Sequence, residues 1–127
     1  MLVDEELTRK IIKIIGAAVE VHKNIGPGLL ESAYEACLCW ELDYRGLKYQ
    51  RQVPLPVVFK GVSLECGYRM DVVVDDRVVV EVKSIETLGP IHEAQLMTYL
   101  RLSKKRVGLL INFNCILLRD GILRRVI

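Results

Sequence analysis

The sequence has few of the residues that build specialised small scaffolds. Its 127 residues include two histidines, four prolines and four cysteines, with no CxxC pair among them. Neither a zinc finger nor a small secreted domain stabilised by disulfide bonds is therefore expected. No stretch approaches the roughly 20 apolar residues that a membrane-spanning helix needs, and no charged leader precedes an apolar run. We expect a soluble, cytoplasmic protein with no membrane partner.

Apolar residues, by contrast, are plentiful. The chain is 51% hydrophobic and 27% charged, which excludes disorder, collagen and coiled coil and predicts a single domain over residues 1–127 with a substantial core. The cysteines lie inside hydrophobic segments and are interpreted as reduced core thiols; they are Cys37, Cys39, Cys66 and Cys115.

Charge is balanced overall but unevenly distributed. The formal net charge is +2, while the last 27 residues hold seven basic side chains and one acidic side chain. This segment could face a polyanion such as nucleic acid. A solvated surface explains it equally well.

Hydrophobic periodicity predicts three helices and several strands. Helices are expected over the first 24 residues with Asp4 as N-cap, from Leu29 to a stop at Gly46, and over about 91–102. Strands are expected at 49–53, 55–60, 64–74, 78–84 and 107–112, with a last hairpin turning at 120–121. The order predicts an α/β (α+β) fold built on one mixed sheet.

Three ionisable residues interrupt the apolar strands of the expected 64–84 hairpin. Glu81 and Lys83 share a face, and Asp71 joins them only if residues 71 and 81 pair, which requires a three-residue loop or a bulge. We predict that register, because two carboxylates beside an ammonium suit Mg²⁺ or Mn²⁺ and metal-assisted hydrolysis. The alternative is an exposed Asp71 beside a self-compensating Glu81–Lys83 pair.

Two helical features are ambiguous. Glu31 and Glu35 lie one turn apart after a Gly-Pro-Gly segment, and acidic residues there are also explained by the helix dipole. His22 falls on the apolar stripe of the first helix, where a core or interface histidine is the alternative to a metal ligand.

A polar stripe runs along the third helix. His92, Gln95 and Tyr99 recur at i, i+3 and i+7 in a segment otherwise filled by apolar residues. Imidazole, amide and phenol groups together can hold a phosphate or the edge of a base. The alternative is a core-facing Tyr99 with a solvent-facing Gln95.

Together these segments resemble a known family. The string Gly28-Leu-Leu-Glu-Ser-Ala-Tyr-Glu35 reproduces the signature of the GxxExxY proteins. Asp71, Glu81-Val-Lys83 and Gln95-x3-Tyr99 are similar, in order, to the motifs of the PD-(D/E)xK nuclease superfamily, in its RecB-like and Cas4-like branch. The four cysteines do not match the iron–sulfur pattern of Cas4-like proteins.

The resemblance implies a restriction-endonuclease-like core, a mixed β-sheet flanked by helices, and metal-dependent phosphodiester hydrolysis. By the same resemblance Lys83 is the catalytic lysine, and Gln95 and Tyr99 position the substrate. The implied metal ligands are Asp71, Glu81, the carbonyl of Val82, Glu31 and His22.

The leading hypothesis is therefore an Mg²⁺- or Mn²⁺-dependent nuclease acting on DNA, or alternatively on RNA. Because the chain leaves no room for a separate recognition domain, a homodimer or partner subunit would supply any elaborate specificity. The first rival is a catalytically silent nucleic-acid-binding or scaffold subunit of the same fold. The second is a dimerisation module using the surface around Trp40 and Tyr44.

Overall fold

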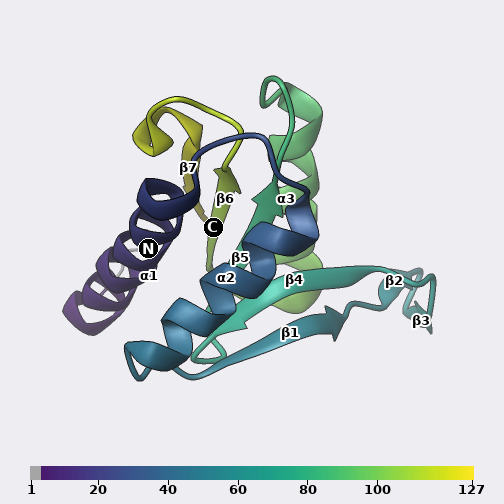
Figure 1. Ribbon diagram of the computed structural model, residues 1–127. Helices are drawn as coiled ribbons and strands as arrows, with labels where there is room; N and C mark the ends of the chain where they lie inside the picture. Colours follow the sequence, from purple (N-terminus) through teal and green to yellow (C-terminus); the bar gives the residue numbers. More distant parts are fainter. Residues whose placement is uncertain (1–3) are drawn as a thin grey trace.

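A computed structural model describes residues 4–127 and shows a five-stranded mixed sheet between helices (Figure 1). The helices are α1 (Glu5–Ile25), α2 (Glu31–Tyr44) and α3 (Pro90–Ser103). The strands are β1 (Tyr49–Pro54), β2 (Val57–Phe59), β3 (Val62–Leu64), β4 (Arg69–Val74), β5 (Val78–Lys83), β6 (Val107–Asn112) and β7 (Ile122–Val126). The expected fold class is confirmed. Within the described part of the chain, no helix is long and apolar enough to cross a membrane.

Local sequence signals set the ends of the helices. The carboxylate of Asp4 accepts the backbone N–H of Leu7 at 2.8 Å, so the expected N-cap of α1 is confirmed. Gly26 ends that helix with φ 76°, a left-handed conformation that suits glycine. Pro90 starts α3, where its missing N–H costs no helical hydrogen bond.

The sheet has the order β1-β4-β5-β6-β7. Only β5 and β6 are parallel, and α3 is the crossover that joins them; the other neighbours are antiparallel. Helices α1 and α2 cover one face and α3 covers the other (Figure 1). On β5, Val78, Val80 and Val82 pack under α1 and α2, whereas Val79 packs under α3. Both faces are covered, which explains the continuous apolar runs in the central strands.

The segment before β4 differs from the sequence expectation. Residues 55–60 and 64–74 are not two long strands, because β2 and β3 form a separate hairpin that turns at Lys60-Gly61, and β4 begins only at Arg69. Both turn residues have positive φ, 50° and 77°. This hairpin projects beyond the end of the main sheet (Figure 1).

The carboxyl-terminal region also differs in detail. Residues 113–117 form no strand, and the expected turn at Asp120-Gly121 is a short 3-10 helix over Leu118–Gly121 that leads back to β7 beside β6. A Cβ atom at Gly121 would collide with the carbonyl of Asn112, so the chain can pass there only as glycine.

All four cysteines are free thiols, as expected. Their placement in the core is correct only in part. Cys39 is buried, Cys37 and Cys115 are half-buried, and Cys66 is exposed. Cys66 lies between β3 and β4, outside both strands, where no core face is available to it.

Candidate active site

The predicted β4–β5 register is confirmed. Val74 pairs with Val78 and Val72 with Val80, so the loop has three residues, Asp75, Asp76 and Arg77. Continuing this register places Asp71 opposite Glu81. The prediction rested on the two-residue period of strands, and it brings the two carboxylates onto adjacent strands.

Backbone pairing is interrupted across this row of the sheet. The β4–β5 ladder stops at Val72, and the β1–β4 ladder skips the position where Gln52 faces Asp71. Met70 packs in the same core layer as Val73, so the side-chain alternation of β4 also breaks at Asp71. The strands diverge here and leave backbone N–H groups for other partners.

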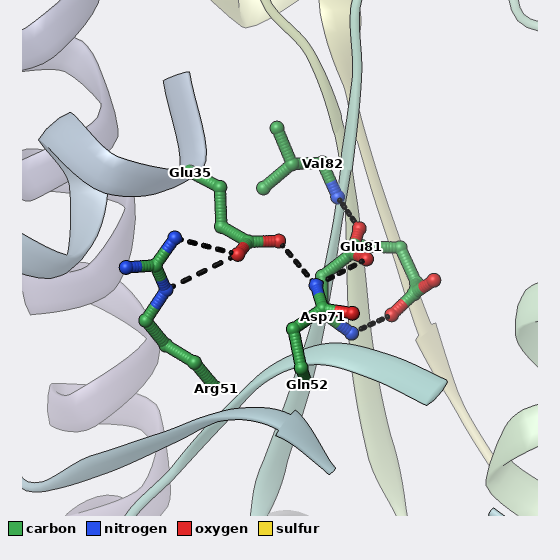
Figure 2. Close-up of polar contacts among 6 residues, drawn as sticks. All are labelled: Glu35, Arg51, Gln52, Asp71, Glu81 and Val82. Atoms are coloured by element: carbon green, nitrogen blue, oxygen red, sulfur yellow. Dashed lines mark hydrogen bonds and ion pairs between the residues drawn. The ribbon is translucent and has the colours of Figure 1, made fainter. Parts of the chain in front are cut away.

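Carboxylates take over those N–H groups. The N–H of Asp71 donates to Glu81 Oε2 at 2.8 Å, and the N–H of Val82 donates to Asp71 Oδ2 at 2.8 Å (Figure 2). Each carboxylate thus fastens the strand that carries the other. One oxygen of each group is held in place, which fixes where its second oxygen can point.

A third carboxylate reaches this site from α2. Glu35 is only 7% exposed, and its Oε2 accepts from Arg51 Nε at 3.1 Å and Nη2 at 2.9 Å. Its Oε1 accepts from Gln52 Nε2 at 2.8 Å, and the same amide lies 3.5 Å from Asp71 Oδ1 (Figure 2). Gln52 therefore links the carboxylates of Glu35 and Asp71.

Gln52 adopts an unusual backbone conformation for this role. Its φ is 50°, in the left-handed region, although it lies within β1. A non-glycine residue in that region costs on the order of 1 kcal/mol or more, and such strain concentrates at functional sites. The distortion coincides with the gap in the β1–β4 ladder.

Burial makes negative charge on the carboxyl groups of this cluster unfavourable. Glu81 is 4% exposed, and burial, followed by repulsion from Asp71, raises its pKa to about 8. Burial and the nearby charge of Glu35 also raise the pKa of Asp71, against the hydrogen bond from Val82. A cation placed between the carboxylates would offset both effects.

Lys83 connects the cluster to α3. Its Nζ donates to Gln95 Oε1 at 3.4 Å, and Gln95 Nε2 donates to the Tyr99 hydroxyl at 3.3 Å. Burial, followed by the charge of Glu81, raises the pKa of Tyr99. The structure thus brings the predicted Asp71, Glu81, Lys83, Gln95 and Tyr99 together.

Glu31 lies outside these contacts, and its role as a metal ligand stays a prediction. It is the exposed first residue of α2, and no described contact ties it to the cluster. Glu35, one turn later, faces the sheet instead. The signal was available, because Glu35 precedes the buried Leu38 and Leu42 at i+3 and i+7.

Tyr34, which belongs to the same GxxExxY string, has a structural role. Tyr34 is fully buried and stacks on Phe113, with ring centroids 4.7 Å apart. Its hydroxyl donates to the carbonyl of Gly26 at 2.6 Å and accepts from the N–H of Leu29 at 3.1 Å. It therefore fixes the loop between α1 and α2.

His22 is also engaged elsewhere. It is buried, and its Nε2 lies 2.7 Å from the carbonyl of Cys115. A carbonyl can only accept, so this nitrogen carries the proton and offers no lone pair to a metal. The structure thus gives His22 a hydrogen bond within the core through Nε2, and its role as a metal ligand stays a prediction.

The donor set fits a magnesium-like ion held in part by its substrate. Among residues 4–127, no three His, Cys, Asp or Glu side chains form a complete metal-binding group. Asp71 and Glu81 are instead a pair of carboxylates. Mg²⁺ is commonly bound by one or two carboxylates together with waters and substrate phosphates. The fit is therefore with an ion of this kind and not with a four-ligand cage.

Comparison with known families identifies the fold. The profile of the PD-(D/E)XK nuclease superfamily matches residues 6–126. The chain belongs to this superfamily. No curated protein and no solved structure gives a significant match. The mixed sheet flanked by helices is the restriction-endonuclease-like fold.

Membership in the PD-(D/E)XK superfamily supports a nuclease activity on a nucleic-acid substrate, and nucleases of this superfamily generally use divalent metal ions. The superfamily name describes an aspartate followed by Asp or Glu, one residue, and Lys. Asp71 and Glu81-Val82-Lys83 supply that sequence in this chain.

Proposed function

We propose that the protein is an Mg²⁺- or Mn²⁺-dependent nuclease that hydrolyses phosphodiester bonds in DNA, and that residues 1–127 act as one nuclease-like domain. The observation that carries the proposal is the opposed pair Asp71 and Glu81. The two carboxylates meet where the ladder stops, and their pKa values are raised. Holding the strands together does not require two buried ionisable groups, and a bound cation would offset the free-energy cost of burying them.

In the proposed site Asp71 and Glu81 hold the cation, with the carbonyl of Val82 as a further ligand. The ion would supply charge stabilisation at the scissile phosphate and a more acidic water. Glu35 is proposed as a positioning residue, a different role from the metal ligation that the resemblance implied for Glu31. It keeps Gln52 against Asp71 and so orients that carboxylate.

Lys83 is proposed as the residue that orients the attacking water. Its ammonium is held by Gln95 Oε1 at 3.4 Å, on the side of α3. That contact leaves two of its three N–H groups for water or a phosphate oxygen. Tyr99 in turn holds Gln95, so the pair steadies the lysine and the strand that it meets.

The GxxExxY string and the Gln95-x3-Tyr99 pair support the RecB-like and Cas4-like branch. The basic carboxyl-terminal segment supports nonspecific phosphate contacts. A homodimer or partner subunit would add any sequence specificity, and a cytoplasmic location suits such an enzyme.

The test is cleavage of single-stranded, duplex and flapped DNA and of RNA, with Mg²⁺, Mn²⁺ or EDTA. Wild-type protein is expected to cut only with a metal. Asp71→Asn is expected to cut at least about 100-fold more slowly, and the matched control Asp120→Asn, which changes an exposed carboxylate, at the wild-type rate. Equal rates for both variants would overturn the proposal.

Lys83→Met separates catalysis from metal binding. We expect cleavage to be lost while calorimetry still shows Mn²⁺ binding. Lys13→Met, at an exposed position on α1, is the control for charge removal. Absence of cutting by wild type on every substrate, with nucleic acid still bound, would favour the silent binding subunit.

A further inference from the structure

A groove opens beside Lys83 on the face of the sheet covered by α3. It has a volume of about 570 Å³, within the usual range for small-ligand sites. One wall is α3, and the other is Val57 at the base of the β2–β3 hairpin together with Tyr68 just before β4. The site described above uses Lys83, Gln95 and Tyr99, but it leaves the rest of this groove unexplained.

The groove has an aromatic wall. The rings of Tyr68 and Tyr99 meet edge to face, with centroids 6.2 Å apart. Tyr99 is buried, whereas Tyr68 is 47% exposed and Ile91 on the opposite wall is 73% exposed. Exposed apolar side chains gathered around one groove are typical of ligand-binding sites.

The polar groups of the groove are of kinds that can hydrogen-bond to the edge of a nucleobase. Among the described lining residues there is no carboxylate; the polar ones are Lys83, His92, Gln95, Thr98 and the tyrosines. His92 Nδ1 accepts the N–H of Gly89 at 2.8 Å, so the neutral ring carries its proton on Nε2 and can donate. Arg101, on the same helix, donates to Thr98 Oγ1 at 3.0 Å.

We propose that this groove binds one unstacked nucleobase of the substrate, with Tyr68 as the stacking platform. The inference rests on the proposed nuclease function and names its substrate class. Because Lys83 belongs to both the groove and the catalytic cluster, a strand whose phosphate lies at Asp71 and Glu81 places a neighbouring base in the groove. A base inside an intact duplex cannot reach it.

The substrate class is therefore a single strand, or a duplex with an unpaired nucleotide at the cleavage point. Stacking on an aromatic ring accepts any base, so the groove selects for strandedness and not for sequence. This selection needs no separate recognition domain.

The first experiment measures binding in EDTA, so that no cleavage occurs, with three fluorescent oligomers of equal length: single-stranded DNA, duplex DNA and a strand of abasic deoxyribose phosphates. Wild-type protein is expected to bind the single strand roughly 10-fold more tightly than the other two. The abasic strand keeps the phosphates and lacks the bases. Equal affinity for all three would overturn the proposal, because phosphates alone would then explain binding.

Substitutions in and near the groove test whether the base binds there. Tyr68→Ala is expected to lose about 10-fold in single-strand affinity and nothing in duplex affinity, whereas Tyr68→Phe keeps both. Tyr44→Ala is the matched control, because Tyr44 is an exposed tyrosine on α2 outside the groove. Ala94→Phe, which fills the groove from the exposed side of α3, should reproduce the loss. Unchanged single-strand binding by both Tyr68→Ala and Ala94→Phe would overturn the proposal.

Cleavage assays separate this inference from the proposed function. If single-strand binding depends on Tyr68 but no metal supports cutting, the groove stands and the nuclease proposal fails. If wild type and Tyr68→Ala both cut duplex and single strand at equal rates, the nuclease stands and the groove proposal fails.

Discussion

The backbone N–H of Asp71 donates to the carboxylate of Glu81 across the end of the β4–β5 ladder, at 2.8 Å. Asp71 and Glu81, the two residues of the proposed metal site, therefore also hold strands β4 and β5 together. Changes of pH or metal at this site should consequently be visible in the stability of the fold.

Apo protein should become less stable as pH rises. The Glu81 carboxyl has an ordinary pKa of 4.5, and in the folded chain its pKa is raised to about 8. Between these values the folded state keeps a proton that the unfolded state has released, so the free energy of unfolding falls with pH across this window. Denaturant titrations in EDTA at pH 5, 7 and 9 measure it. Glu81→Gln should flatten the dependence, and the exposed Glu86→Gln should not. An equal slope in Glu81→Gln would refute the assignment.

Metal binding should release a proton. A protonated Glu81 is a poor ligand, so Mn²⁺ must displace its proton below about pH 8. Affinity should then rise by up to about 10-fold per pH unit as pH approaches that value. Calorimetry at pH 7 in two buffers of different ionisation enthalpy counts the protons. Glu81→Gln should bind Mn²⁺ more weakly and release fewer protons on binding. Proton release equal to that of wild type would exclude Glu81 as the source of the proton.

Arg51→Met should destabilise the fold. Glu35 is buried and accepts two hydrogen bonds from Arg51, and the substitution leaves a buried carboxylate without its cation. We expect a loss of about 1–3 kcal/mol in the free energy of unfolding. The control is Arg9→Met, which removes an exposed helical pair with Glu5 and should cost under about 0.5 kcal/mol. Similar losses in both variants would show that the Glu35–Arg51 pair has no special role.

Gln52→Gly should separate activity from stability. Glycine relieves the left-handed backbone at φ 50° but removes the amide that joins Glu35 to Asp71. We expect cleavage to fall by about 10–100-fold, with the free energy of unfolding within about 1 kcal/mol of wild type. Asp76→Gly, at φ 56° in the β4–β5 loop, is the matched control and should keep full activity. Full activity in Gln52→Gly would mean that Asp71 needs no such orientation.

Much of the site could be predicted because strand geometry is rigid. The period of two placed Glu81 and Lys83 on one face, and the cost of unpaired charges in an apolar hairpin predicted the register that puts Asp71 beside them. Glu35, Arg51 and Gln52 were not foreseen. Glu35 was missed because acidic residues near the start of a helix are already explained by the helix dipole. Gln52 was missed because nothing in the sequence indicates a residue with a left-handed backbone inside β1.

The missed β2–β3 hairpin has a similar cause. Its strands have three residues each, too short to show alternation, and the turn depends on Lys60 in a left-handed conformation. Long central strands were foreseen because burial on both faces makes them uniformly apolar, whereas short exposed strands carry almost no pattern.

The three-residue loop after β4 has a consequence for how this sequence can change. Surface loops usually tolerate insertions and deletions, and Asp75, Asp76 and Arg77 lie apart from the carboxylate cluster. Removing one of them leaves the strand pairs possible across a two-residue turn, whereas removing one residue between Asp71 and Val74 would move Asp71 out of register with Glu81. The spacing of residues along β4 between Asp71 and the loop is thus constrained by the chemistry of the site, and the loop should accept a change in residue number more readily than this strand segment.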